Sequence, residues 1–529
     1  MNTLTGTRAL ARLALRLDRV RLTVWVLGIA VMPMGTAANY LTLYPTQQDL
    51  RAVSGVLTNP SLVALSGPLY DVSIGGLTAW KIGVTEFILV ALMSMLTVVR
   101  HTRTEEETGR LELLGATVVG RWAPLTAALL VTTLADLVIA VLIALGLIAT
   151  GLPAVGSVAF GLATGLVGLL FAAIAAVAAQ LTQSARAATG IAAAVLGGTY
   201  LLRAVGDTGP TWLSWLSPTG WALQMRPYGD ERWWVAALFV VVAAVFATAG
   251  YALAGRRDMG AGLLPERPGP VTAAPSLRSP LALAWRLHRG LLLGWVIALA
   301  LTGAVLGGAA AGIRNMESPN QQLTDILSRM GGPNGFTDAF LGAIFGLIGM
   351  VAAAYTVQAT LRLRQEESSG RVELLLATRV SRVRWAASHL AFALLGTALL
   401  LAVAGLAGGL AYGAQVHDVG GQVARLLGTA MVQLPAAWVL AGLGTALVGL
   451  APRISSLAWA ALIVSVLASE LGALFGLNQW IVDLTPFTHV PKLPGSAFTV
   501  TPVLWLTVAA VALSAAGLAG LRRRDMPVT

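Results

Sequence analysis

Residues 125–150 read LTAALLVTTLADLVIAVLIALGLIAT, and Asp136 is the one charged residue among these 26 positions. A helix needs about 20 mainly apolar residues to cross the roughly 30 Å hydrocarbon layer of a bilayer. The whole chain of 529 residues has a similar character, with 56% hydrophobic and 11% charged residues. Soluble domains carry about 25% charged residues. The sequence therefore predicts an all-α polytopic membrane protein.

Eleven further stretches have the length and apolar composition of a membrane-spanning helix, which makes about 12 transmembrane helices as two sets of six. The first set lies near residues 22–40, 82–100, 125–150, 155–181, 188–205 and 233–254. The second set lies near residues 291–313, 341–361, 387–412, 426–450, 457–475 and 503–520. Segments between them are too short for a soluble catalytic domain. The glycine-rich stretch Gly303–Gly312 predicts close helix packing.

The two sets are repeats of one another. The tetrapeptide R-R-D-M at residues 256–259 recurs at residues 523–526, where it ends the second set. We predict a first six-span half at 1–262, a proline-rich cytoplasmic linker at 263–280 and a second half at 281–529. Since each half has an even number of spans, the halves are parallel repeats with one orientation.

Charge predicts the orientation of the spans. With the N-terminus inside, 26 of the 35 lysines and arginines fall on the cytoplasmic side, which favours cytoplasmic N and C termini. The net charge of +11 is then explained by these loops, and we expect no nucleic acid as a partner. Lys81 and Lys492 are the two lysines, and the arginine-rich, alanine-rich composition is typical of a GC-rich bacterial genome. The predicted location is the plasma membrane of a bacterium.

A helix is predicted ahead of the first span. Residues 9–20 carry Leu10, Leu13 and Leu17 at helical spacing with arginines on the other faces, which indicates an amphipathic helix along the inner membrane surface. A matching segment, Trp285-Arg286-Leu287, precedes the second half.

A charged segment follows the second span of each half. Residues 103–121 read RTEEETGRLELLGATVVGR, and residues 364–382 read RQEESSGRVELLLATRVSR. Both fit the pattern R-x-E-E-x-x-G-R-φ-E-L-L-x-A-T-x-V-x-R, where φ is apolar. We call these the motif segments. A solvated loop with chance charge pairs would explain one copy, but two copies at equivalent positions favour a function.

The predicted local structure of each motif segment is a short charged helix on the cytoplasmic surface. Glu106–Arg110 and Glu367–Arg371 are pairs at i,i+4, a spacing that stabilises helices by a few tenths of a kcal/mol. The residues that carry the function are predicted to be Glu105, Glu106, Gly109, Arg110, Glu112, Leu113 and Leu114, and Glu366, Glu367, Gly370, Arg371, Glu373, Leu374 and Leu375.

At these residues the chain resembles the permease subunits of the ABC-2 exporter family, and it looks most like the fused, double-length permeases of actinobacterial antibiotic and polyketide exporters. The resemblance covers both halves, and its core is E-E-x-x-G-R-x-E-L-L. It implies six helices per half, leading amphipathic helices, and a coupling helix in the loop between spans two and three that docks onto an ATPase subunit. The motif acids would then meet basic residues of that partner, and the leucine pair an apolar groove.

The resemblance also implies the activity. The chain would be the permease of an ATP-driven exporter that moves a hydrophobic or amphipathic compound out of the cell. It would work with two copies of a separate ATPase, one under each half, with ATP and magnesium bound there. The chain itself is not expected to be an enzyme or to hold a cofactor. A P-loop needs G-x-x-x-x-G-K-[ST], whereas Lys81 follows Trp80 and Lys492 follows Pro491.

Metal sites are not expected either, because the chain has no cysteine and five scattered histidines. Three acids fall within predicted spans: Glu86, Asp136 and Glu470, of which the first two align with Leu347 and Thr397 in the other half. Intramembrane acids usually face a cavity or a partner, so Glu86 and Asp136 are either polar contacts for a substrate or proton, or structural hydrogen-bonding groups.

Two other classes of function stay open at this point. The alternative is a proton-coupled, twelve-span secondary transporter of the major facilitator type, in which Glu86 or Asp136 would carry the coupling proton. The loop after span two lacks the G-x-x-x-D-R-x-G-R pattern of those transporters. A membrane sensor is the third class, and no signalling domain supports it.

Overall fold

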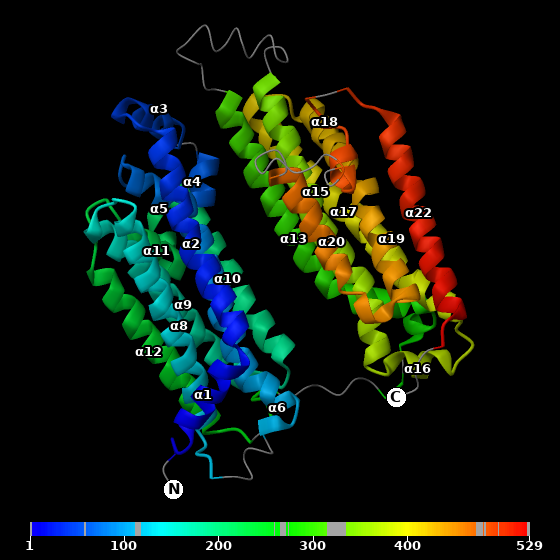
Figure 1. Cartoon of the computed structure of the whole chain (residues 1–529), viewed down its shortest axis with the longest axis horizontal. Helices are drawn as coiled ribbons and strands as arrows, with labels where there is room; N and C mark the ends of the chain where they lie inside the picture. The colour runs from blue at the N-terminus through cyan, green and yellow to red at the C-terminus, as the bar shows by residue number, and fades with distance from the viewer. Residues whose placement is uncertain are drawn as a thin grey trace. The chain divides into compact units, whose positions relative to one another are not determined.

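The structure is a computed structural model, shown in Figure 1. It describes residues 3–57, 60–111, 118–258, 260–264, 271–272, 274–314, 335–471, 480, 483–495 and 497–525. The described residues form helices and connecting turns, without a strand. The chain divides into two compact units, Met1–Gly269 and Pro270–Thr529.

The first unit contains the helices of the first predicted set. They are α1 (Thr7–Leu17), α2 (Arg19–Leu43), α3 (Gln47–Leu57), α4 (Pro60–Ser66), α5 (Ile74–Val99), the π-helical turn η1 (Arg100–Thr104), α6 (Glu105–Glu107), α8 (Ala123–Ala149), α9 (Ala154–Leu181), α10 (Ala185–Thr208), η2 (Thr211–Leu216), α11 (Pro218–Gln224) and α12 (Trp234–Ala254).

The second unit contains the helices of the second set. They are η3 (Pro275–Leu277), α13 (Pro280–Arg314), α15 (Gly335–Ser368), α16 (Arg371–Leu376), α17 (Arg382–Val416), α18 (Val419–Met431), α19 (Leu434–Leu450), η4 (Pro452–Ile454), α20 (Leu457–Leu471), η5 (Pro486–His489) and α22 (Val500–Arg523).

Eleven helices among the described residues are long and apolar enough to cross a membrane, and a shorter apolar helix, Leu457–Ser469, stands at the predicted eleventh span. The fold class is therefore confirmed as an all-α polytopic membrane protein. Span ten consists of two helices, α18 and α19, joined at Val432-Gln433. Residues 472–475 of the predicted span eleven lie outside the described residues.

In the first unit, α9 is the most buried span and packs against α8, α5, α12 and α10. Small residues make this approach close. A Cβ on Gly161 would lie 2.3 Å from the carbonyl oxygen of Ala140 in α8, so only glycine fits there. Apolar side chains of α5, α8 and α9, such as Phe87, Ile139 and Phe171, complete the core.

In the second unit, α17 packs against α13, α18 and α15, while α19 packs against α22. The predicted role of the glycine-rich stretch is confirmed here. Cβ atoms on Gly303 and Gly307 would each lie 2.4 Å from a carbonyl oxygen of α17, belonging to Ala404 and Gly408 respectively. The backbones of α13 and α17 are therefore in direct contact.

The two leading segments differ. In the first unit α1 ends at Leu17 and α2 starts at Arg19, and the buried carboxylate of Asp18 between them pairs with Arg100 (2.9 Å) and His101 (2.8 Å). A separate leading helix was expected in both halves. In the second unit, however, α13 runs unbroken from Pro280 to Arg314, and His288 stands at the position of Asp18.

Figure 1 shows α1 and α6 at one end of the first bundle, with α3 and α4 at the opposite end. In the second bundle α16 lies at the end opposite α18. Each motif segment is thus presented at one end of its own bundle.

Candidate functional site

Each motif segment continues a membrane-spanning helix before it turns. In the second unit α15 runs to Ser368 and includes both glutamates, and α16 begins at Arg371. In the first unit the helix of span two runs on through η1 and α6 to Glu107. Gly109 and Gly370 both have φ of 70°, the left-handed region that glycine enters without steric cost. The prediction of one short helix carrying a whole segment is therefore wrong, because the acids belong to the span helix.

The left-handed glycines also change the charge pairing. The predicted pairs, Glu106–Arg110 and Glu367–Arg371, are not formed. Instead Arg110 lies 3.5 Å from Glu105, and Arg371 lies 3.7 Å from Glu366. The i,i+4 rule assumes a continuous helix, and the turn at glycine brings the arginine to the preceding glutamate. Both arginine side chains are about two-thirds exposed, so these pairs contribute little, about 0–1 kcal/mol.

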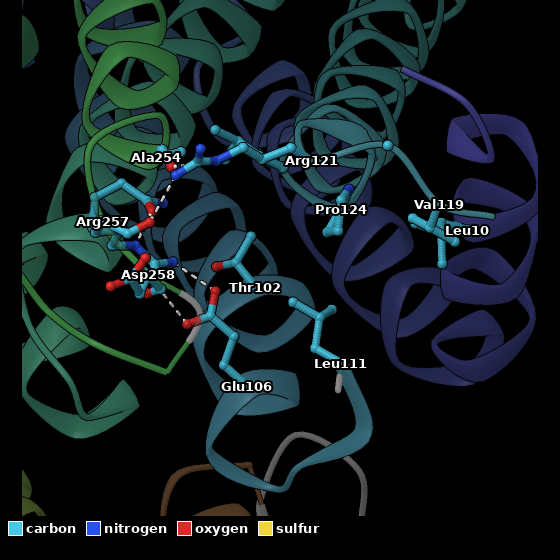
Figure 2. Close-up of a pocket in the computed structure, with 13 residues that line it drawn as sticks. Leu10, Thr102, Glu106, Leu111, Val119, Arg121, Pro124, Ala254, Arg257 and Asp258 are labelled. Carbon is cyan, nitrogen blue, oxygen red and sulfur yellow. Dashed lines mark hydrogen bonds and ion pairs between the residues drawn. The ribbon is translucent and has the colours of Figure 1, made fainter. Parts of the chain in front are cut away.

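Glu106 has internal partners. Its two carboxylate oxygens accept hydrogen bonds from Arg257, Nη2 to Oε1 at 2.6 Å and Nη1 to Oε2 at 2.9 Å, as Figure 2 shows. Arg103 is its second cationic partner. Arg257 belongs to the R-R-D-M tetrapeptide at the end of the first half, so the two repeated patterns of the sequence meet here.

Glu367 has the corresponding ion pairs in the second unit, but it accepts one hydrogen bond from its tetrapeptide arginine where Glu106 accepts two. Arg524 Nη2 donates to Glu367 Oε1 at 2.7 Å, and Arg364 Nη1 lies 3.3 Å from Oε2. Arg524 is the counterpart of Arg257 in the second R-R-D-M tetrapeptide.

The last arginine of each motif segment completes the arrangement. Arg121 donates to the carbonyl oxygen of Arg257 at 2.8 Å, and Arg382 donates to that of Arg524 at 2.6 Å. We call these groups the clamps. The first clamp consists of Arg103, Glu106, Arg121 and Arg257, and the second of Arg364, Glu367, Arg382 and Arg524.

The first clamp is buried at its centre. The Arg103 side chain is fully buried and also donates to the carbonyl oxygens of Ala179 and Ala261, both at 3.0 Å. Arg257 also donates to Gln180 Oε1 at 2.6 Å. Buried charges are stable only when they are paired and hydrogen-bonded. The clamp therefore fastens the end of span two to the ends of α9 and α12.

Other motif residues lie at the surface. Leu374 is 79% exposed, and Arg371 is exposed beside it, whereas Leu375 packs against the core of the second unit. Glu373 is half-buried. The predicted site residues Glu112, Leu113 and Leu114 lie outside the described residues.

A pocket of about 390 Å³ opens beside the first clamp (Figure 2). Leu10 of α1, Leu111 of the motif segment and Pro124 of α8 line its apolar side. Glu106 and Arg257 lie on its polar side. The pocket thus lies between the leading helix α1, the motif segment and the end of the last span of the half, α12.

Comparison with known proteins identifies the family of the chain. The family model described as "Multidrug efflux system permease Rv1217c, C-terminal domain" matches it twice, over residues 8–253 and 277–522. The chain belongs to this family of permeases. It is 48% identical over 525 residues to the multidrug efflux system permease protein Rv1217c of Mycobacterium tuberculosis (strain ATCC 25618 / H37Rv), covering 99% of this chain and 95% of that protein. With its many apolar helices, the permease is a multi-pass membrane protein.

The intramembrane acids of the permease lie in its first unit. Asp136 in α8 is buried, its Oδ1 accepts a hydrogen bond from Ser94 of α5 at 2.7 Å, and its Oδ2 has no partner among the described residues. Glu86 in α5 is fully buried, and both its carboxylate oxygens lack a hydrogen bond within the described part of the chain. Glu470 belongs to α20, and its side chain lies outside the description.

The second unit of the permease has a neutral version of the Asp136 contact. Thr397, which aligns with Asp136, shares a hydrogen bond with Thr356 of α15. A polar pair thus links the second and third spans of each half, with a carboxyl group in one and hydroxyl groups in the other.

Sequence reasoning missed the cluster of Asp18, Arg100 and His101. Asp18 is more than 80 positions from the adjacent Arg100 and His101, and nothing local marks them as partners. The sequence shows only that Asp18 and His288 occupy aligned positions. In the structure each is buried and bonded to a histidine, His101 at 2.8 Å and His389 at 3.0 Å respectively.

Proposed function

We propose that this permease is the membrane subunit of an ABC-2 type exporter that moves hydrophobic or amphipathic, drug-like compounds out of a bacterial cell. The name of its relative, a multidrug efflux system permease, supports the cargo class. In this proposal two six-span halves sit in the plasma membrane with both termini in the cytoplasm. The energy comes from two copies of a separate ATPase subunit, which bind ATP and magnesium.

The observation that carries the proposal is the repeated clamp. Each half holds its motif segment at the corresponding end of its bundle, and in each clamp three arginines surround one glutamate in corresponding ion pairs. Glu106 and Glu367 are already paired inside the chain, so we assign the contact with the ATPase to exposed residues, such as Arg110, Arg371 and Leu374. On this surface a partner could bind the guanidinium group of Arg371 and the exposed apolar side chain of Leu374.

The clamp also suggests how force would enter the membrane. Glu106 joins the end of span two to Arg257 at the end of span six, and Glu367 joins α15 to Arg524 at the end of α22. A displacement of the motif segment would therefore move two spans of that half together. Buried, multiply bonded ion pairs suit this role because their geometry is fixed.

A second candidate is the proton-coupled secondary transporter. The observation that favours it is the pair of buried acids with unpartnered oxygens, Glu86 and Asp136. Their counterparts Leu347 and Thr397 cannot titrate, so a proton route would use the first half alone.

The test combines partner binding with transport. The double substitution Arg371→Glu and Leu374→Asp changes two exposed side chains outside the clamp. Val271→Asp, at a fully exposed position of the linker, is the control. We expect the double variant to lose co-purification of a P-loop ATPase from native membranes and ATP-driven uptake of ethidium into inside-out vesicles, while the control keeps both.

Membrane abundance is checked by blot in every case. If the double variant retains the ATPase and the uptake at normal abundance, the motif segments are not the docking sites. Uptake that needs no ATP and collapses with an uncoupler would support the proton-coupled candidate instead, and Asp136→Asn would then abolish it.

A further inference from the structure

A second surface pocket lies at the start of α13, and no residue of either clamp lines it. It measures about 430 Å³. Its lining combines η3, the residue before it and the first turns of α13: Ala274, Ser276, Leu277, Ala282, Trp285, Arg286 and Arg289.

The two arginines of this pocket differ from those of the clamps. Arg286 and Arg289 are exposed, and neither has an ion pair or a hydrogen bond within the described structure. A guanidinium carries five donors in a rigid fork that matches the oxygens of a phosphate. Two such groups one helical turn apart, with no ion-pair partner among the residues that the structure describes, form a site for an anion.

The rest of the surface indicates an anion with a hydrophobic part. Trp285 is 49% exposed, and tryptophan prefers the boundary between lipid and water. Beyond Arg289, the exposed side chains Leu293 (61%), Ile297 (51%) and Leu301 (39%) follow at intervals of four, which places them in one row along the helix. The segment Pro280–Gly308 of α13 is long and apolar enough to cross a membrane, and this exposed row runs along it from the pocket.

We propose that this surface, Trp285, Arg286 and Arg289 with the row below them, binds an anionic phospholipid. The two guanidinium groups bind the phosphate, the indole ring lies at the interfacial level, and the acyl chains lie along the apolar row. A soluble anion would use the arginines alone. The proposal is independent of ATP coupling and of the cargo.

The first half supplies a matched control, because it lacks the same combination. Arg16 and Arg19 align with Arg286 and Arg289, but the helix breaks between them at Asp18. Leu15 takes the position of Trp285. The break places the two arginines on different helices, Arg16 on α1 and Arg19 on α2.

The experiment measures lipid binding to the full-length chain in detergent by native mass spectrometry, titrating phosphatidylglycerol and, separately, phosphatidylcholine. For Arg286→Gln with Arg289→Gln we expect the apparent Kd for phosphatidylglycerol to rise about tenfold or more. Arg16→Gln with Arg19→Gln removes the same charge and should change it less than about threefold. Arg286→Lys with Arg289→Lys should retain most of the affinity.

Folding is checked by circular dichroism and gel filtration, and it should be unchanged because both arginines are exposed and neither has an ion pair or a hydrogen bond within the described structure. Equal losses in the two glutamine variants, or none in either, would overturn the proposal, since binding would then reflect diffuse charge only. Equal affinity for phosphatidylcholine would overturn it too. Displacement of the lipid by millimolar inorganic phosphate would identify a soluble-anion site rather than a lipid site.

Discussion

The clamp makes a quantitative prediction about Glu106. The substitution Glu106→Ala removes the carboxylate shared by Arg103 and Arg257, whose side chains are 0% and 8% exposed. Removing one partner of a buried ion pair costs about 3–5 kcal/mol, because the other charge is left without compensation. Arg103 keeps its two carbonyl acceptors and Arg257 keeps Gln180, so we expect the lower end of that range, about 3 kcal/mol.

The neighbouring residue is the control. Glu107 is exposed, and no ion pair involves it among the described residues, so Glu107→Ala should change stability by less than about 0.5 kcal/mol. A double-mutant cycle with Arg257→Ala then isolates the pair. We expect the double variant to be more stable than the two single losses predict, with a coupling of about 0.5–3 kcal/mol.

The assay is thermal unfolding of the purified chain in detergent, together with hydrogen exchange of backbone amides near residue 106 and residue 257. Glu106→Ala should lower the unfolding temperature and speed exchange at both places, whereas Glu107→Ala should do neither. Indistinguishable profiles for Glu106→Ala and Glu107→Ala would refute the clamp. So would faster exchange near residue 106 alone, because the two ends would then not be joined.

Three further outcomes are expected, two from the geometry and one from the distribution of charge. Gly370→Ala places a side chain at a φ of +70°, and it should weaken the turn by about 1 kcal/mol, seen as faster proteolysis at the motif segment. Gly168→Ala sets a Cβ 2.3 Å from Asp136 Oδ1 and should reduce membrane abundance on a blot, whereas Asp136→Asn, which keeps the acceptor, should not. Topology reporters fused after Arg121 should report the cytoplasm and those near Gly220 the outside, by the charge bias of the loops.

The spans could be predicted because their signal is local. A window of about 20 residues contains all the information that decides whether a helix can cross the bilayer. Thus the stretch at 125–150 became α8, Ala123–Ala149, with a shift of two residues at one end and one at the other. The continuity of α13 was not predictable in the same way, since the break in the first half depends on Asp18 and its distant partners.

The pairing within the clamps could not be predicted either. Both repeated patterns were visible in the sequence, but Glu106 and Arg257 are 151 positions apart, and spacing does not report such a contact. The i,i+4 rule predicts a pair between Glu106 and Arg110. That rule assumes a continuous helix, and Gly109, at a φ of 70°, interrupts it. Each copy of the motif has a glycine at the same place, Gly109 in the first and Gly370 in the second. Such a shared glycine is itself a sign of a turn.

Comparing the two halves indicates which functions the clamps and the buried acids can have. A task that both halves perform must rest on residues that both halves carry. The clamps meet this condition in their ion pairs and in the bond from the last arginine of the motif segment, whereas Glu86 aligns with a leucine and Asp136 with a threonine. Ser94–Asp136 and Thr356–Thr397 both link the second and third spans, so the link is shared and only the carboxyl group is peculiar to the first half. The acids therefore belong to whatever distinguishes the halves, and the clamps to what they have in common.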